Sequence, residues 1–180
     1  MNEQLEFQRC LDKRWLIRMP EARYLVTKEL DVSQNDLVEA RSSLDRESYK
    51  WSTIQSYYAM FHAARSLLYS RGYREKSHYC LSVAMRHLFV AQGFLDEALV
   101  NDLDDARALR EDADYQAKFS QVSAGYNLKA ARRLIARISD LLAGWDAESG
   151  RLLLHQWTIR DPLLHIWGFK SYHQPSHVGS

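Results

Sequence analysis

One stretch, from Trp51 to Arg71, constrains the fold of this chain more strongly than any other. Apolar and aromatic side chains recur in it at steps of three and four residues, which places them along one face of an α-helix. The members of this stripe are Ile54, Tyr57, Tyr58, Phe61, Ala64 and Leu68. Alanines within the stretch would let a neighbouring helix approach closely. The pattern therefore predicts the central helix of a helical bundle.

The same stretch carries polar groups that are unusual for a core helix. Ser56, Tyr57, Tyr58 and His62 place three hydroxyl groups and an imidazole within two turns. A buried polar group without a hydrogen-bond partner costs about 1–3 kcal/mol, so each of these groups needs a partner. We therefore expect a polar seam along one edge of the central helix, open to a ligand at a junction between helices.

The composition favours a single all-α domain without a membrane segment. The chain has 180 residues, of which 46% are hydrophobic, and this length suits one domain with a sizeable core. The formal net charge of +1 gives no overall attraction to nucleic acid, so any such surface has to be a local patch. No apolar run approaches the ~20 residues of a membrane span. The polar, acidic N-terminus is unlike a secretory signal, which indicates a cytoplasmic protein.

The cysteines and histidines give no pattern typical of a metal site. Cys10 and Cys80 are too few and too isolated for a disulfide framework or a zinc site, which favours a reducing cytoplasm. Pro175 interrupts the spacing of His173 and His177, so helical chelation by that pair is disfavoured. We expect no bound metal and no cofactor.

Hydrophobic periodicity predicts a helix in six parts of the chain: residues 3–18, 21–44, 51–71, 77–93, 96–115 and 120–142. Ser77 is the predicted N-cap of the fourth of these. We divide the chain into an N-terminal helix, a helical bundle and a C-terminal appendage, at residues 1–20, 21–145 and 146–180. The appendage is apolar enough that we expect it to pack on the bundle or on another subunit, with its last residues disordered.

Three short blocks appear in the order and at the spacing of a known family. They are Ser56-Tyr57-Tyr58-Ala59-Met60-Phe61-His62-Ala63-Ala64, then Gly72-Tyr73 with Lys76-Ser77-His78, then Arg110 with Ala113-Asp114-Tyr115. Together they resemble the HEPN family (higher eukaryotes and prokaryotes nucleotide-binding), in particular its small stand-alone prokaryotic branch. The resemblance covers about residues 21–145. It implies an all-α, mostly antiparallel bundle of four to five core helices, with the N-terminal helix and the C-terminal appendage as additions.

The family's ribonucleases share an Arg-x(4–6)-His motif, in which arginine stabilises the phosphate and histidine moves protons. RNA is then cleaved without a metal ion, with the 2′-hydroxyl group as nucleophile. At the equivalent spacing this chain has Arg110 followed by Tyr115, so a tyrosine replaces the histidine. A tyrosine with a pKa near 10 is a poor general base at neutral pH, although it can donate a hydrogen bond or accept a nucleotidyl group. His78 is the best candidate to replace the missing histidine, and Arg71 precedes it by seven positions.

Each candidate residue also has an ordinary structural interpretation. Arg110 and Asp114 are spaced for an intrahelical ion pair worth about 0.2–0.5 kcal/mol. The acidic neighbours of Tyr115 repel RNA phosphates. His78 can also be interpreted as an ordinary surface or capping histidine. His62 can be interpreted as a core histidine with a hydrogen-bond partner.

We consider three functions for these residues. The first is a nucleotide- or RNA-associated module that partners a minimal nucleotidyltransferase in a two-gene toxin–antitoxin or defence system, as the resemblance implies. The second is a metal-independent endoribonuclease, and the third is a purely structural helical bundle. The resemblance also implies a homodimer whose cleft lies on the two-fold axis, where Arg110 meets its mate. The candidate catalytic residues are Arg110, Tyr115 and His78, and the candidate cleft residues are Tyr58, His62, Arg71, Arg74 and Asp114.

Overall fold

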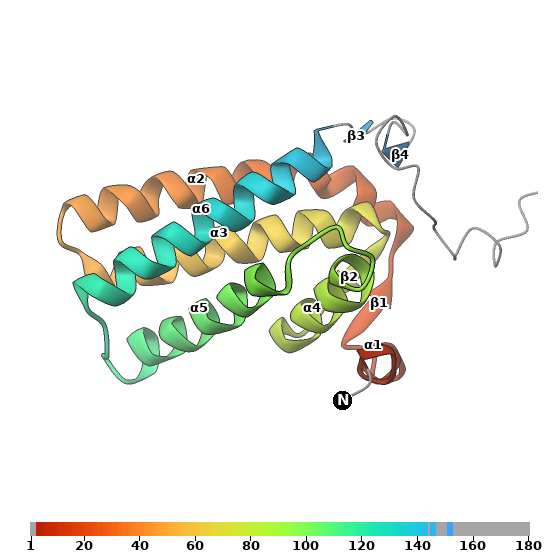
Figure 1. Ribbon diagram of the computed structural model, residues 1–180, viewed down its shortest axis with the longest axis horizontal. Coiled ribbons are helices and arrows are strands. Elements are labelled where there is room, and N and C mark those ends of the chain that lie inside the picture. The colour runs from red at the N-terminus through yellow and green to blue at the C-terminus, as the bar shows by residue number, and fades with distance from the viewer. Residues whose placement is uncertain (1–2, 144, 147–150, 153–180) are drawn as a thin grey trace, which may run out of the picture.

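A computed structural model describes residues 3–143, 145–146 and 151–152, and it confirms the predicted all-α antiparallel bundle. Four long helices run alternately in opposite directions, with two shorter helices at one end (Figure 1). The α-helices are α1 (Glu3–Asp12), α2 (Val26–Asp45), α3 (Tyr49–Ser70), α4 (His78–Met85), α5 (Glu97–Tyr115) and α6 (Gln121–Leu142). The short strands are β1 (Leu16–Arg18), β2 (Tyr73–Glu75), β3 (Trp145–Asp146) and β4 (Arg151–Leu152).

Helix α3 is the central element, as the sequence predicts. It packs against α2, α5 and α6 (Figure 1), and most of its residues are buried. Ala59, Ala63 and Ala64 are fully buried, because their small side chains let the neighbouring helices approach closely. Ser33 on α2 donates a hydrogen bond of 2.8 Å to the carbonyl oxygen of Ala59. The core therefore forms around α3, and the polar groups of that helix must emerge between its neighbours.

Helices α5 and α6 begin one residue after Asp96 and Ser120, the first residues of the predicted ranges, and both residues are N-caps. The Asp96 carboxylate accepts a hydrogen bond of 2.9 Å from the amide of Ala98 at the start of α5. Ser120 and Ser123 form a capping box at the start of α6. Ser77 takes the predicted N-cap position of α4 with an extended backbone, but its side chain makes no capping hydrogen bond.

The N-terminal region differs from the single helix predicted over residues 3–18. Helix α1 ends at Asp12, and Arg14 has a positive φ of 55° that turns the chain into β1. Strand β1 pairs antiparallel with β2, which lies in the stretch between the helices predicted over residues 51–71 and 77–93. The pair is extended at both ends by backbone hydrogen bonds, from Met19 to Gly72 and from Lys76 to Trp15, each 2.7 Å long. Helical periodicity within residues 3–18 carries no information about this distant partner strand.

Two other predicted helices change character along their length. The helix predicted over residues 21–44 starts as a 3₁₀ helix, Pro20–Leu25, and becomes α2 only at Val26. The helix predicted over residues 77–93 is α-helical as α4 and continues as a π-helix, Arg86–Val90. Gly93 has a φ of 76° and follows the last turn, where the sequence predicts the end.

Cys10 on α1 and Cys80 on α4 are joined by a disulfide bond, so the interpretation that they are too isolated for disulfide bonding is wrong. They are 70 positions apart in the sequence, and the β1–β2 pairing brings α1 onto α4. Two isolated cysteines in a sequence do not reveal such a meeting in space. The number of cysteines consequently gives no support to a reducing compartment.

Three further predictions concern membrane segments, metal sites and the C-terminal appendage. In the part of the chain that the structure describes, no helix is long and apolar enough to cross a membrane. The same part contains no group of three or more side chains of the kinds that bind metal ions. Apart from β3 and β4, the predicted C-terminal appendage lies outside the described residues.

Candidate functional site

The candidate site begins at two adjacent tyrosines of α3, which meet different partners. The buried hydroxyl group of Tyr57 is hydrogen-bonded to Nδ1 of His78, the first residue of α4. The imidazole of His78 stacks on Phe61, with 4.5 Å between ring centroids, and on Tyr57 at 5.8 Å. One hydroxyl and two aromatic rings therefore fix the orientation of His78.

The protonation of this pair follows from its surroundings. Burial raises the pKa of Tyr57, so its hydroxyl group keeps its proton and donates it to Nδ1 of His78. Burial, followed by the positive charges of Arg110, Arg65 and Arg107, lowers the pKa of His78. The imidazole is consequently neutral at pH 7, with its own proton on Nε2. The His78 ring is covered by Phe61 and Tyr57, although the residue as a whole is exposed, and no described residue accepts a hydrogen bond from Nε2.

Arg110 is held beside this pair by the second tyrosine. Its Nη2 donates a hydrogen bond of 2.8 Å to the hydroxyl group of Tyr58, and its guanidinium carbon lies 5.5 Å from the centre of that ring. The rings of Tyr57 and Tyr115 are each 5.9 Å away. The predicted ion pair with Asp114 is present, with 3.2 Å between Nε and Oδ2. Arg110, Tyr58, Asp114, Tyr115 and His78 therefore gather around the first half of α3.

Helix α4 lies antiparallel to α5, and the contacts between the two helices show which turn of α5 lies beside His78. Ser82 on α4 donates a hydrogen bond of 2.7 Å to Asp104, and Arg86, one turn later at the start of the π-helix, contacts Asp104 and the preceding turn of α5. His78 lies one turn before Ser82, so it lies opposite the turn of α5 that follows Asp104. That turn contains Arg107, which the sequence analysis missed. The signal available was its position three residues before Arg110, on a neighbouring part of the same helix face.

His62 has other partners than the rest of the site. Its Nδ1 lies 2.7 Å from a carboxylate oxygen of Glu29, and its Nε2 lies 3.9 Å from one of Asp36, both on α2. Arg65 is 3.6 Å from the same Glu29 carboxylate. Two carboxylates beside the imidazole disfavour a phosphate at this position. The ordinary interpretation of His62, a histidine with satisfied partners, fits this geometry.

The structure does not bring Arg71 together with Arg110. Arg71 follows the end of α3, and its guanidinium carbon lies 5.5 Å from the ring of Phe89 and 5.7 Å from that of Phe94. At a rise of about 1.5 Å per residue, it lies on the order of 20 Å along α3 from the tyrosine that binds Arg110. Arg74 is exposed on β2, where it pairs with Ile17 of β1.

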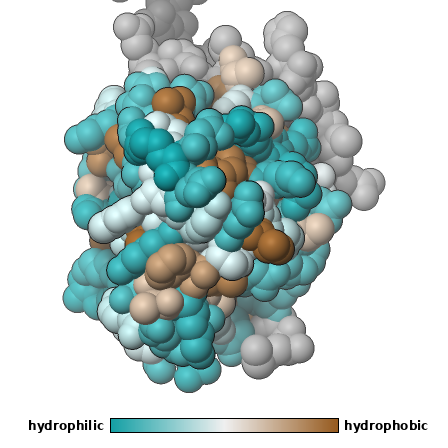
Figure 2. Space-filling model, turned by 90° about the vertical axis from the view of Figure 1, so that its left-hand side faces the viewer, coloured by the Kyte–Doolittle hydropathy of each residue, from teal (hydrophilic) through white to brown (hydrophobic). Residues whose placement is uncertain are grey.

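Large hydrophobic side chains are exposed at the end of the bundle next to Tyr115. Tyr115 is 77% exposed, Phe119 46% and Val122 82%, and they span the turn from α5 to α6. Figure 2 views the molecule from this end, where hydrophobic patches lie among hydrophilic side chains. Contiguous exposed apolar surface is typical of an interface with another molecule.

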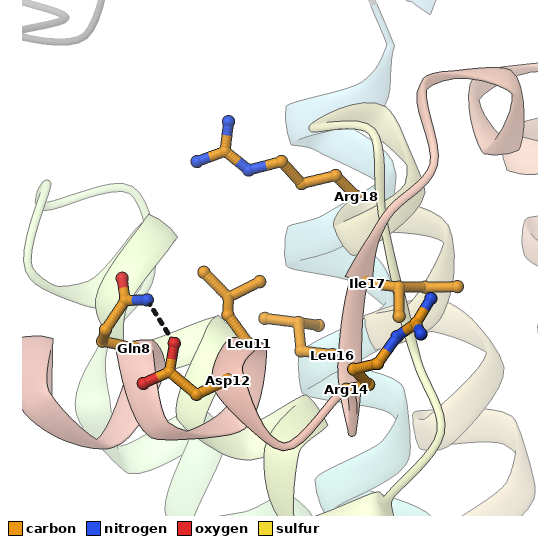
Figure 3. A pocket seen from close by; sticks show the side chains of 7 residues that line it. All are labelled: Gln8, Leu11, Asp12, Arg14, Leu16, Ile17 and Arg18. Carbon is orange, nitrogen blue, oxygen red and sulfur yellow. Dashed lines mark hydrogen bonds between the residues drawn. The ribbon is translucent and has the colours of Figure 1, made fainter.

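A hollow of about 380 Å³ lies between α1 and β1, away from these residues. Figure 3 shows Leu11 and Leu16 facing each other in it, with Arg18 extending from β1 beside them. Gln8 is hydrogen-bonded to Asp12 along α1, at 2.8 Å. None of the predicted site residues lines this hollow, so the cluster around His78 and Arg110 remains the candidate site.

Comparison with known proteins decides the family. A family model described as the HEPN domain matches residues 28–142, which is more than half of the chain. The chain belongs to the HEPN family. This HEPN protein is also 26% identical over 86 residues to a protein of Methanocaldococcus jannaschii named "Putative toxin MJ0605". The match covers 48% of this chain and 64% of that protein, so the chain spans less than two thirds of the length of that relative.

The lowered pKa of His78 predicts that acid destabilises the fold. An unfolded chain, in which histidine titrates near pH 6.5, takes up this proton at a higher pH than the folded chain does. The contribution of the neutral His78 side chain to the free energy of unfolding is therefore fully present above about pH 6.5. It is lost as the pH falls from that value through the pKa of His78 in the folded state. Arg110, Arg65 and Arg107 add to this effect, and Glu111 opposes it. Urea midpoints at about pH 7.5 and 5.5 should differ less in His78→Gln than in the wild type, and equal differences would contradict the assignment.

Proposed function

We propose that this HEPN protein is a toxin-type module that binds RNA or a nucleotide at Arg110 and His78. We further propose that it works with a minimal nucleotidyltransferase in a two-gene toxin–antitoxin or defence system. Its similarity to a protein named as a toxin supports the first part of this proposal. The partner rests on the resemblance to stand-alone HEPN proteins, and its gene should lie next to the gene for this chain.

The observation that carries the binding proposal is the pair of adjacent tyrosines. Tyr57 orients a neutral imidazole that presents an N–H group, and Tyr58 orients a guanidinium group. The Nε2–H of this imidazole and the guanidinium N–H groups can only donate hydrogen bonds, since Nδ1 is already occupied by Tyr57, and donors alone suit a phosphate oxygen. The Asp114 carboxylate neutralises part of the charge of Arg110, so the site is suited to moderate affinity.

A homodimer is part of the proposal. The exposed side chains of Tyr115, Phe119 and Val122 supply an apolar surface beside Arg110. A two-fold axis through that surface would place two copies of the site in one cleft, with self-complementary contacts around it. Dimerisation would also cover apolar groups that are otherwise in water.

Replacing Arg110 with alanine should weaken the binding of a fluorescein-labelled single-stranded RNA about tenfold, because one charge-assisted hydrogen bond is lost. Fluorescence anisotropy at constant salt measures this loss. Arg132→Ala, which removes an exposed arginine of α6, is the matched control and should change the affinity by less than twofold. Equal effects of the two substitutions would contradict a phosphate site at Arg110.

A metal-independent endoribonuclease is the second candidate, and the free Nε2–H of His78 favours it. In that reaction the 2′-oxygen bonds to phosphorus while its proton passes to solvent. The bond from phosphorus to the 5′-oxygen breaks, and the 5′-oxygen takes a proton from solvent, while Nε2–H of His78 and the guanidinium group of Arg110 donate hydrogen bonds to the phosphoryl oxygens. The RNA samples from the binding experiment test this candidate directly. The enzyme would be established if products with 2′,3′-cyclic phosphate ends form in the presence of EDTA and do not form with His78→Gln. If the RNA stays intact, the protein is a binding module and not a ribonuclease.

A further inference from the structure

The structure contains a second arginine beside His78 that none of the foregoing functions uses. We infer that Arg107 forms, with Arg110 and His78, a binding position for two neighbouring phosphate groups. This inference rests on the proposed function and narrows it. The ligand class becomes a chain of at least two phosphates, as in an RNA strand or a nucleoside polyphosphate, and a single phosphate would engage Arg110 without using Arg107.

The first argument is the placement of Arg107 on α5. Arg107 and Arg110 are three residues apart, so their side chains leave neighbouring parts of one helix face, with about 5–6 Å between their Cβ atoms. The contact of Ser82 with Asp104 fixes the register of α4 against α5. One turn further, that register places His78 opposite Arg107, while the hydroxyl of Tyr58 holds Arg110. The two guanidinium groups therefore approach the imidazole from one helix.

The second argument is that Arg107 has no carboxylate of its own. Arg65, Arg86, Arg110 and Arg133 each form an ion pair with an aspartate or glutamate. Among the described residues, by contrast, none lies within ion-pair distance of Arg107, which is half-buried. Burying part of a guanidinium group without a counter-ion costs free energy, which an anionic ligand would recover.

The third argument is electrostatic. The charge of Arg107 lowers the pKa of both Tyr57 and His78, which indicates that it lies close to their polar atoms. Glu111 has the opposite effect on both groups, so it also faces this position and limits its net positive charge. Glu111 and Asp114 together offset the charges of the two arginines, so what suits the site to neighbouring phosphates is its set of directed N–H donors, from two guanidinium groups and a neutral imidazole.

Three probes separate the possibilities, namely a five-nucleotide RNA, ATP and AMP. Arg107→Ala should weaken the binding of RNA or ATP about tenfold and leave the binding of AMP within twofold. For RNA it should also reduce the slope of log affinity against log salt by about one. Arg110→Ala should weaken the binding of every probe that the wild type binds. The comparison of RNA with ATP identifies which source of adjacent phosphates the site prefers.

A ligand-free measurement tests the placement separately. In NMR titrations of the imidazole protons, Arg107→Ala should raise the pKa of His78, whereas Arg132→Ala should leave it unchanged. An unchanged pKa in Arg107→Ala would overturn the geometry. A wild type that binds RNA or ATP but is unaffected by Arg107→Ala would overturn this inference and leave the proposed function intact. A wild type that binds none of the three probes would overturn both.

Discussion

Replacing Arg65 with methionine should lower the free energy of unfolding by about 3 kcal/mol or more, because it leaves a buried carboxylate without its counter-ion. Nε of Arg65 donates a hydrogen bond of 2.8 Å to Oε1 of Glu75, whose side chain is only 2% exposed. Methionine keeps much of the volume of arginine next to Phe61, whose ring lies 4.3 Å from the guanidinium carbon. The loss measured by urea denaturation would therefore report the charge more than the packing.

Two controls isolate this charge. The double variant Arg65→Met with Glu75→Gln should recover a large part of the loss, because no buried charge is then unpaired. Arg86→Met removes an arginine of similar exposure, but the side chains of its partners Glu97 and Asp104 are 45% and 29% exposed. Water can solvate those carboxylates, so this substitution should cost about 1 kcal/mol or less. A cost for Arg65→Met no greater than that for Arg86→Met would show that Glu75 is not a buried charge.

The ion pair of Arg65 and Glu75 also matters for the position of the site. Glu75 ends β2, and His78 begins α4 shortly afterwards. Anchoring Glu75 to α3 therefore fixes where α4 starts, and so where His78 meets Tyr57 and Phe61. Arg65→Met should disturb the His78 resonances as well as the stability, which links the core to the site.

The sequence predicts a helix correctly where the residues that determine it are close together in the chain. The three- and four-residue spacing around Tyr57 predicts α3 because that helix is buried on most sides by its own apolar residues. The predicted ranges of α5 and α6 begin at Asp96 and Ser120, which cap the two helices by bonding to amides only two or three residues away. Short-range interactions of this kind are visible in a single sequence.

Pairings between distant segments could not be predicted in the same way. Strand β1 forms because β2 supplies its hydrogen-bond partners, although its residues continue the helical pattern of α1. Cys10 meets Cys80 only once that strand pair has formed. Arg65 and Glu75 are closer in the sequence, but they meet only because the turn at Gly72 folds β2 back beside α3, and the sequence does not indicate this contact.

The candidate site shows both situations. Arg110 with Asp114 is a local spacing, and the predicted ion pair is present. The contact of Tyr57 with His78 joins two helices, and the sequence offered both residues without indicating that they touch. Arg107 was missed because its importance depends on the register of α4 against α5, which Ser82 and Asp104 determine.

Reducing the disulfide bond between Cys10 and Cys80 should lower the free energy of unfolding by about 4 kcal/mol. The bond closes a loop of 70 residues, and in the chain-entropy treatment a loop of this length restricts the unfolded chain by about that amount. Urea denaturation with and without dithiothreitol measures the difference. Cys10→Ser should reproduce the reduced value and should not respond to dithiothreitol. A wild type whose midpoint is the same in both conditions would show that the two thiols are not joined in solution.

The source of this stabilisation can be tested separately from its size. In the folded protein, α1 is also held by noncovalent contacts, because Phe7 stacks on His87 at 4.3 Å and Tyr79 donates a hydrogen bond of 3.0 Å to Glu6. Cutting the disulfide should therefore leave the folded state almost unchanged and expand the unfolded one. The dependence of the unfolding free energy on urea should become steeper, since a more open unfolded chain exposes more surface. A less steep dependence would instead indicate that α1 detaches before the bundle unfolds, so that the disulfide acts mainly as a clamp on the native structure.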